Sequence, residues 1–144
     1  MASGKAITLK YQHEHLEDSV LVYSCAECSV YLIASTDGAH RSFVKLTFQG
    51  VQCVRSASTD CTPAMGIFPE PPGASFIAEI TDTRWPEEAR KAYVYATSSR
   101  APSGRHFVVS NHDIFHEILA ESFTESLVGP SDAGYHEISG HFGR

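Results

Sequence analysis

The sequence predicts a mainly β protein, built as an antiparallel sheet or sandwich with one or two short helices. The clearest sign lies in residues 43–48, where apolar side chains alternate with polar ones. A period of two residues is typical of a strand with one solvated face. Residues 20–25 and 29–35 are rich in β-branched and aromatic side chains, which favour strands. The dipeptide Asp37-Gly38 then predicts a turn, because both residues tolerate positive φ.

Local patterns predict the other elements of the 144-residue chain, whose length suits one domain. The short polar break at Ala26-Glu27 predicts a hairpin turn. Residues 56–75 contain many prolines and glycines and predict a loop. Pro86, followed by two glutamates, predicts a helix that begins near Trp85. We also expect strands over residues 7–11, 51–54, 76–80, 92–98 and 107–109.

The segment 110–128 fits two interpretations. Its apolar residues recur at helical spacing, and Ser110 with Asp113 fits a capping box. This pattern predicts a C-terminal helix over residues 112–127.

Three glutamates oppose that helix. Glu117, Glu121 and Glu125 would repeat every four residues along it, and like charges at this spacing destabilise a helix. A strand is therefore the alternative. With either structure, we expect residues 1–128 to form one β-rich domain and residues 129–144 to form a loose polar tail.

The chain is acidic, with a formal net charge of −6. Such a charge disfavours a broad surface for nucleic acid or for an anionic membrane. Residues 112–144 carry a net charge of −5, whereas residues 1–111 carry −1. The first twenty residues contain no apolar leader, and no apolar run is long enough for a membrane helix. We therefore expect the four cysteines to be free thiols in a cytoplasmic protein.

Four histidines are the candidate metal ligands, and one aspartate is a candidate general base beside them. His112-Asp-Ile-Phe-His116 resembles the HExxH signature of zinc proteases, with Asp113 in place of the glutamate. On a helix the two imidazoles share a face and suit one zinc ion, but the shorter carboxylate lies farther from a metal-bound water. His13 and His15 share one face of an extended segment and could supply a third ligand. Exposed histidines without a metal are the more common outcome of so short a motif, so no cofactor is expected.

Three further segments carry a family resemblance. Residues 15–21 lead into a strand, residues 44–51 follow in the middle, and residues 110–113 precede residues 117–121. In this order they resemble the small β-rich bacterial domains found among immunity proteins of toxin systems and their uncharacterised relatives. The resemblance implies an antiparallel sheet, binding rather than catalysis, and a strand over residues 117–127.

These observations favour a non-catalytic cytosolic binding protein, in a narrower form an immunity-type inhibitor. A basic protein partner would face an acidic C-terminal surface, since complementary charge speeds encounter. The expected binding residues are Asp113, Glu117, Glu121 and Glu125. Two alternatives stay open: a metal-dependent hydrolase at the histidine motif, and a small-ligand binder on the sheet with residues 62–73 as a lid. The oligomeric state stays open as well.

Overall fold

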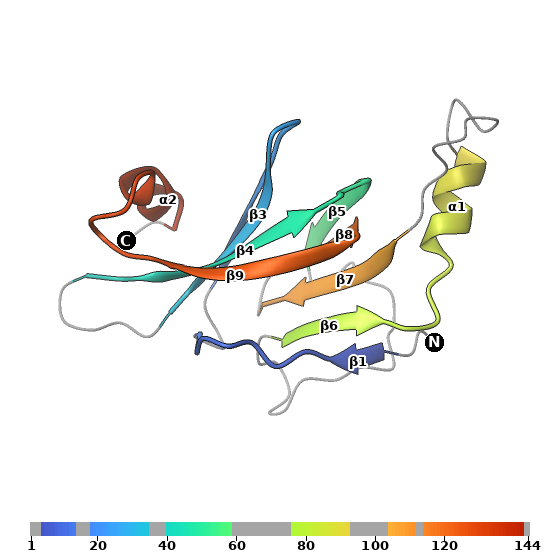
Figure 1. Ribbon diagram of the computed structural model, residues 1–144, viewed down its shortest axis with the longest axis horizontal. Helices are drawn as coiled ribbons and strands as arrows, with labels where there is room; N and C mark the ends of the chain where they lie inside the picture. The colour runs from blue at the N-terminus through green and yellow to red at the C-terminus, as the bar shows by residue number, and fades with distance from the viewer. Residues whose placement is uncertain are drawn as a thin grey trace.

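The computed structural model describes residues 4–13, 18–34, 40–58, 76–92, 104–111 and 114–142. These residues form two antiparallel sheets and two short helices, which lie at opposite ends of the molecule (Figure 1). The predicted mainly β fold class is therefore confirmed. Neither helix in this part of the chain is long and apolar enough to cross a bilayer.

The four-stranded sheet has the order β2-β3-β4-β9. Its strands are β2 (Ser19–Tyr23), β3 (Cys28–Ile33), β4 (Phe43–Gln49) and β9 (Ser122–Val128). In β4 the predicted alternation is confirmed, because Lys45 and Thr47 are partly exposed between buried apolar residues. The predicted hairpin turn is closed by a hydrogen bond of 2.8 Å from the Ser24 N–H to the Glu27 carbonyl oxygen.

The five-stranded sheet has the order β1-β6-β7-β8-β5. Its strands are β1 (Gly4–Ala6), β6 (Phe76–Ile80), β7 (Arg105–Ser110), β8 (Ile114–Ala120) and β5 (Cys53–Ser58). The first strand thus precedes the predicted one at residues 7–11, and β5 extends into the predicted loop as far as Ser58. The rest of that loop, with the proposed lid at residues 62–73, lies outside the described residues, as does the predicted strand after residue 92.

The helix predicted over residues 112–127 is wrong, and the alternative of strands is correct. Residues 114–120 form β8 and residues 122–128 form β9. Every residue of β8 after Ile114 is buried, so both faces of this strand pack against protein. A strand of this kind carries apolar residues at consecutive positions, and such a run also satisfies helical spacing.

Both sheets share one corner. The chain passes from β4 to β5 through Gly50 and from β8 to β9 through Glu121. The two crossings are held together by hydrogen bonds from the Glu121 N–H to the Gln49 carbonyl oxygen, 2.9 Å, and from the Gln52 N–H to the Leu119 carbonyl oxygen, 2.8 Å. Gly50 has φ +64°, a conformation that glycine adopts without steric cost. A paired ribbon therefore bends from one sheet into the other.

The main core lies between the two sheets. Its aromatic centre is formed by Phe48, Phe107 and Phe123, with ring centroids 5.3–5.6 Å apart. The other buried members are Cys28, Val30, Leu32, Ala34, Val44, Leu46, Ile77, Val109, Ile118 and Ala120. Burying this much apolar surface is the dominant stabilising contribution in a protein of this size.

The helices are α1 (Trp85–Ala92) and α2 (Tyr135–His141). The start predicted near Trp85 is confirmed, and the Thr83 hydroxyl caps it by accepting the Trp85 N–H at 3.1 Å. The loose tail expected over residues 129–144 is wrong for α2. This helix buries Tyr135 and Ile138 against the four-stranded sheet, which a polar composition count does not reveal.

Candidate functional site

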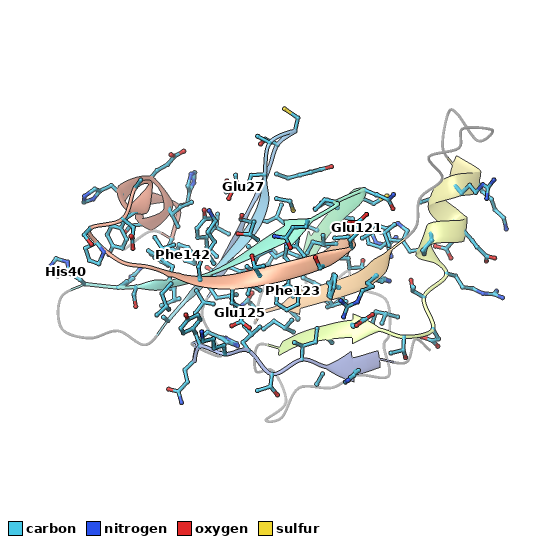
Figure 2. The ribbon with its side chains drawn as sticks, in the orientation of Figure 1. Glu27, His40, Glu121, Phe123, Glu125 and Phe142 are labelled. Atoms are coloured by element: carbon cyan, nitrogen blue, oxygen red, sulfur yellow. The ribbon has the colours of Figure 1, made fainter. Side chains whose placement is uncertain are left out.

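The three glutamates expected to form one acidic surface lie in three different environments. Glu117 is a buried residue of β8, Glu121 is exposed at the corner, and Glu125 is a partly buried residue of β9. Figure 2 labels Glu121 and Glu125, which lie well apart along the ribbon. The corner separates them because the chain changes sheets between residues 120 and 122. Asp113, the fourth expected binding residue, lies outside the described residues.

Glu117 is the centre of a buried ion-pair network. The Arg55 guanidinium donates two hydrogen bonds to its carboxylate, Nε to Oε2 at 2.6 Å and Nη2 to Oε1 at 3.0 Å. His106 Nε2 contacts Oε1 at 2.8 Å. Burial alone raises the pKa of Glu117, but the hydrogen bonds from His106 and Arg55 outweigh burial and hold that pKa below its usual range. The carboxylate is therefore ionised inside the protein.

The same network continues to the start of α1. Because an ionised carboxylate can only accept, His106 Nε2 donates to it, and His106 Nδ1 forms a hydrogen bond of 2.7 Å with the Thr83 hydroxyl. The Trp85 ring packs edge-on against His106 at 4.8 Å, and the Arg55 guanidinium lies 4.1 Å above the Trp85 ring. A hydroxyl, an imidazole and a carboxylate joined in this order can activate a nucleophile. Here the threonine oxygen also accepts the Trp85 N–H at the start of α1, so the network fastens α1 to the sheet.

Glu125 connects the two sheets along one of their edges. Its carboxylate accepts backbone N–H groups of Lys10, at 3.1 Å to Oε1 and 2.8 Å to Oε2, and of Tyr11, at 3.3 Å to Oε2. Lys10 and Tyr11 follow β1, whereas Glu125 belongs to the outermost strand of the other sheet. Glu125 therefore has a structural role within the chain.

His116 connects the two sheets along the opposite edge. It is 2% exposed, and its ring nitrogens contact Ser56 Oγ of β5 at 2.6 Å and Ser19 Oγ of β2 at 3.0 Å. One ring nitrogen donates and the other accepts, so both are occupied. Burial lowers the pKa of His116 to about 4, which keeps the imidazole neutral near neutral pH.

The expected metal ligands are not assembled in the described part of the chain. His13 is partly buried after β1, and His116 is buried between hydroxyls, whereas His15 and His112 lie outside the described residues. Among the described residues, no group of three or more histidine, cysteine, aspartate or glutamate side chains lies close enough to hold a metal ion. The described residues therefore contain no set of ligands for a zinc ion.

A groove opens at the end of the core, where the β2–β3 turn approaches the corner. The strand register aligns Tyr23 with Cys28, and Cys28 with Phe48, so the three form a row across β2, β3 and β4. The groove has a volume of about 190 Å³. We call it the hairpin groove; it is lined by Tyr23, Ser24, Cys25, Ala26, Glu27, Cys28, Phe48, Gly50 and Val51.

The hairpin groove has an apolar floor and a polar rim. Cys28 and Phe48 are buried core residues, and burial, with a smaller effect of the Glu27 charge, raises the pKa of the Cys28 thiol to about 11. The thiol is therefore neutral. At the rim, the Glu27 carboxylate is held by Lys45 at 2.6 Å and by the Ser29 hydroxyl at 2.8 Å. The Glu121 side chain lies next to Gly50, and among the described residues no ion pair forms with its carboxylate.

Sequence reasoning missed most of these residues. Arg55, Thr83 and His106 come from separate elements, and no local spacing links them to Glu117. The position of Tyr23 next to the predicted hairpin turn is the one signal in the sequence for this groove. No family model, curated protein or solved structure matches this chain.

Proposed function

We propose that this chain is a non-catalytic binding protein that receives a side chain of a protein partner in the hairpin groove. The exposure of Tyr23 carries the proposal. Among the described residues, the large apolar side chains that are exposed are Tyr23, at 52%, and Leu127, at 49%. Tyr23 lines the hairpin groove, whereas Leu127 is not among the residues that line it.

The chemistry of the groove supports binding. Tyrosine is enriched among residues that dominate interface energetics, especially beside a desolvated pocket. Cys28 and Phe48 give the groove an apolar floor within a lining that is otherwise largely polar, and the neutral thiol adds no charge to be desolvated. The titratable groups of the buried network are paired with each other instead of lining the groove. Because the titratable groups of this network lie outside the groove, the groove is better suited to binding a partner than to catalysing a reaction.

Of the glutamates expected to bind a partner, Glu121 is the one that is exposed and near the groove. Glu117 and Glu125 are occupied by partners within the chain, whereas Glu121 is exposed at the corner next to Gly50 of the groove. A partner with a basic residue beside its docking side chain is therefore favoured. An immunity-type inhibitor, for which the partner is a toxin, is the narrower form of this proposal. The free thiols of Cys25, Cys28 and Cys53 support a cytoplasmic setting.

Site-specific photo-crosslinking tests the proposal. A benzophenone crosslinker at position 26, in the turn of the groove, is compared with one at position 126, exposed on β9, in extracts of the cells that encode the chain. We expect a discrete partner to be captured from position 26 and not from position 126. Tyr23→Ala should abolish this capture, and Leu127→Ala, the matched control, should not. Equal capture by both variants would exclude the hairpin groove as the binding surface.

A further inference from the structure

The C-terminal helix packs on the sheet through three anchors. Tyr135 and Ile138 are buried and Phe142 is partly buried, so the anchors stand at positions i, i+3 and i+7 on one face. Phe43 lies 5.6 Å from the Tyr135 ring and stacks on the Phe142 ring at 4.9 Å. The Tyr135 hydroxyl donates to the Arg41 carbonyl oxygen at 2.7 Å. Figure 2 shows Phe142 beside α2 at one end of the sheet.

The surface beneath α2 is apolar across all four strands. It is the face turned away from the main core, because the intervening residues of β3, Val30 and Leu32, belong to that core. We call this surface the outer patch; it consists of Val22, Tyr31, Ile33, Phe43 and Val128. A patch of this kind, left uncovered, would favour association with an apolar partner surface.

α2 itself has few features that would hold it as a helix. It has seven residues, includes Gly140, and begins after Gly134 (φ 79°) without a side-chain cap. A helix of this length is marginal in isolation and depends on tertiary packing. The outer patch therefore provides most of the stability of α2, and elements of this sort open locally more easily than core strands.

We propose that the outer patch is a docking site for a short amphipathic helix with an aromatic, an aliphatic and an aromatic residue at i, i+3 and i+7. α2 occupies the site in cis, and a partner helix with the same pattern displaces it. The seated α2 defines the chemistry of this occupant, as in other grooves that read one helical face through spaced anchors. The site is independent of the hairpin groove, which lies on the opposite face of the sheet at Tyr23, Cys28 and Phe48.

A labelled peptide of residues 130–144 tests this inference on the full chain by fluorescence anisotropy. The double variant Ile138→Ala, Phe142→Ala weakens the competing cis helix and leaves the patch intact. It should bind the peptide at least about tenfold more tightly than the unchanged chain, because its own helix no longer competes. Adding Val22→Glu, which alters the patch, should remove binding. A peptide that carries the two alanines is the matched control and should not bind.

The opposite results would overturn the proposal. They are no peptide binding by a double variant whose amide spectrum shows intact sheets, or equal binding by the double variant and the unchanged chain. If the double variant does not fold, hydrogen exchange on the unchanged chain replaces it. Excess peptide should then speed exchange of the chain's own α2 amides and leave β3 unaffected, and unchanged α2 exchange would contradict displacement.

Discussion

His116 shows how one buried residue links the two sheets. Its imidazole bridges Ser19 of one sheet and Ser56 of the other, and it is held neutral because burial lowers its pKa to about 4. In the unfolded chain the same group titrates near the ordinary value of 6.5. The folded state therefore binds fewer protons than the unfolded state between these two values.

This difference predicts a pH dependence of stability. The contribution of His116 is complete above pH 6.5 and is lost as the pH falls towards 4. The loss amounts to about 3 kcal/mol at most. Urea unfolding at pH 7 and pH 4 measures it against His116→Gln, which shares every other titrating group. We expect the unchanged chain to lose more stability than the variant over this range, and equal losses would contradict a buried neutral imidazole.

Glu117 and Glu121 make a matched pair at the same scale. Glu117 is paired with Arg55 and His106 inside the protein, whereas Glu121 is exposed. Removal of one partner from a buried ion pair typically costs about 3–5 kcal/mol, and the half-exposed Arg55 places Glu117→Ala at the lower end. Exposed substitutions usually stay within about 0.5 kcal/mol. Chemical denaturation should therefore separate Glu117→Ala from Glu121→Ala, and similar midpoints would refute the structural role of Glu117.

At the scale of elements, the corner between the sheets depends on Gly50. A Cβ at this position would lie 2.6 Å from the Glu121 Cγ and Cδ atoms, and the backbone has φ +64°. The φ angle alone disfavours other residues by about 1–2 kcal/mol, and the contact adds to this cost unless the glutamate side chain moves. At Gly50 both effects arise where the two crossings of the chain meet.

Gly50→Ala should therefore lower the free energy of unfolding by about 1–3 kcal/mol. Adding Glu121→Ala should recover the part caused by the contact and leave the part caused by φ. Gly140→Ala in α2 is the control, since nothing lies within 4 Å of its added Cβ, and a helical alanine should stabilise by about 0.5–1 kcal/mol. Thermal unfolding of the four proteins checks the order, and a neutral Gly50→Ala would contradict this description of the corner.

Element prediction succeeded for β4, where one face is solvated, and failed for β8, where both faces are buried. The strand β3 is also buried on both faces, but its β-branched and aromatic residues predicted it correctly. In β4, partly exposed Lys45 and Thr47 mark the period of two. In β8, buried positions run from 115 to 120 without interruption, so the apolar pattern fits a helix equally well. The like charges of Glu117, Glu121 and Glu125 were the better guide, because they argued against a helix.

At the scale of the whole molecule, the acidic C-terminal segment divides between structure and surface. Glu117 fixes α1 to one sheet, and Glu125 connects the edges of the two sheets. Glu121 is exposed at the surface. Net charge along the chain could not distinguish these roles, because burial and pairing depend on strands far apart in sequence. The same reason hides the hairpin groove, whose floor joins three strands of the folded sheet.

The central claim is that Tyr23 anchors a partner in the hairpin groove. Calorimetric titration of the captured partner with the unchanged chain, Tyr23→Ala and Leu127→Ala tests it most directly. An interface anchor contributes about 2 kcal/mol or more, so Tyr23→Ala should weaken binding by about 30-fold or more. Leu127→Ala, equally exposed but outside the groove, should change the affinity less than about twofold. An unchanged affinity for Tyr23→Ala, or an equal loss in both variants, would contradict the account.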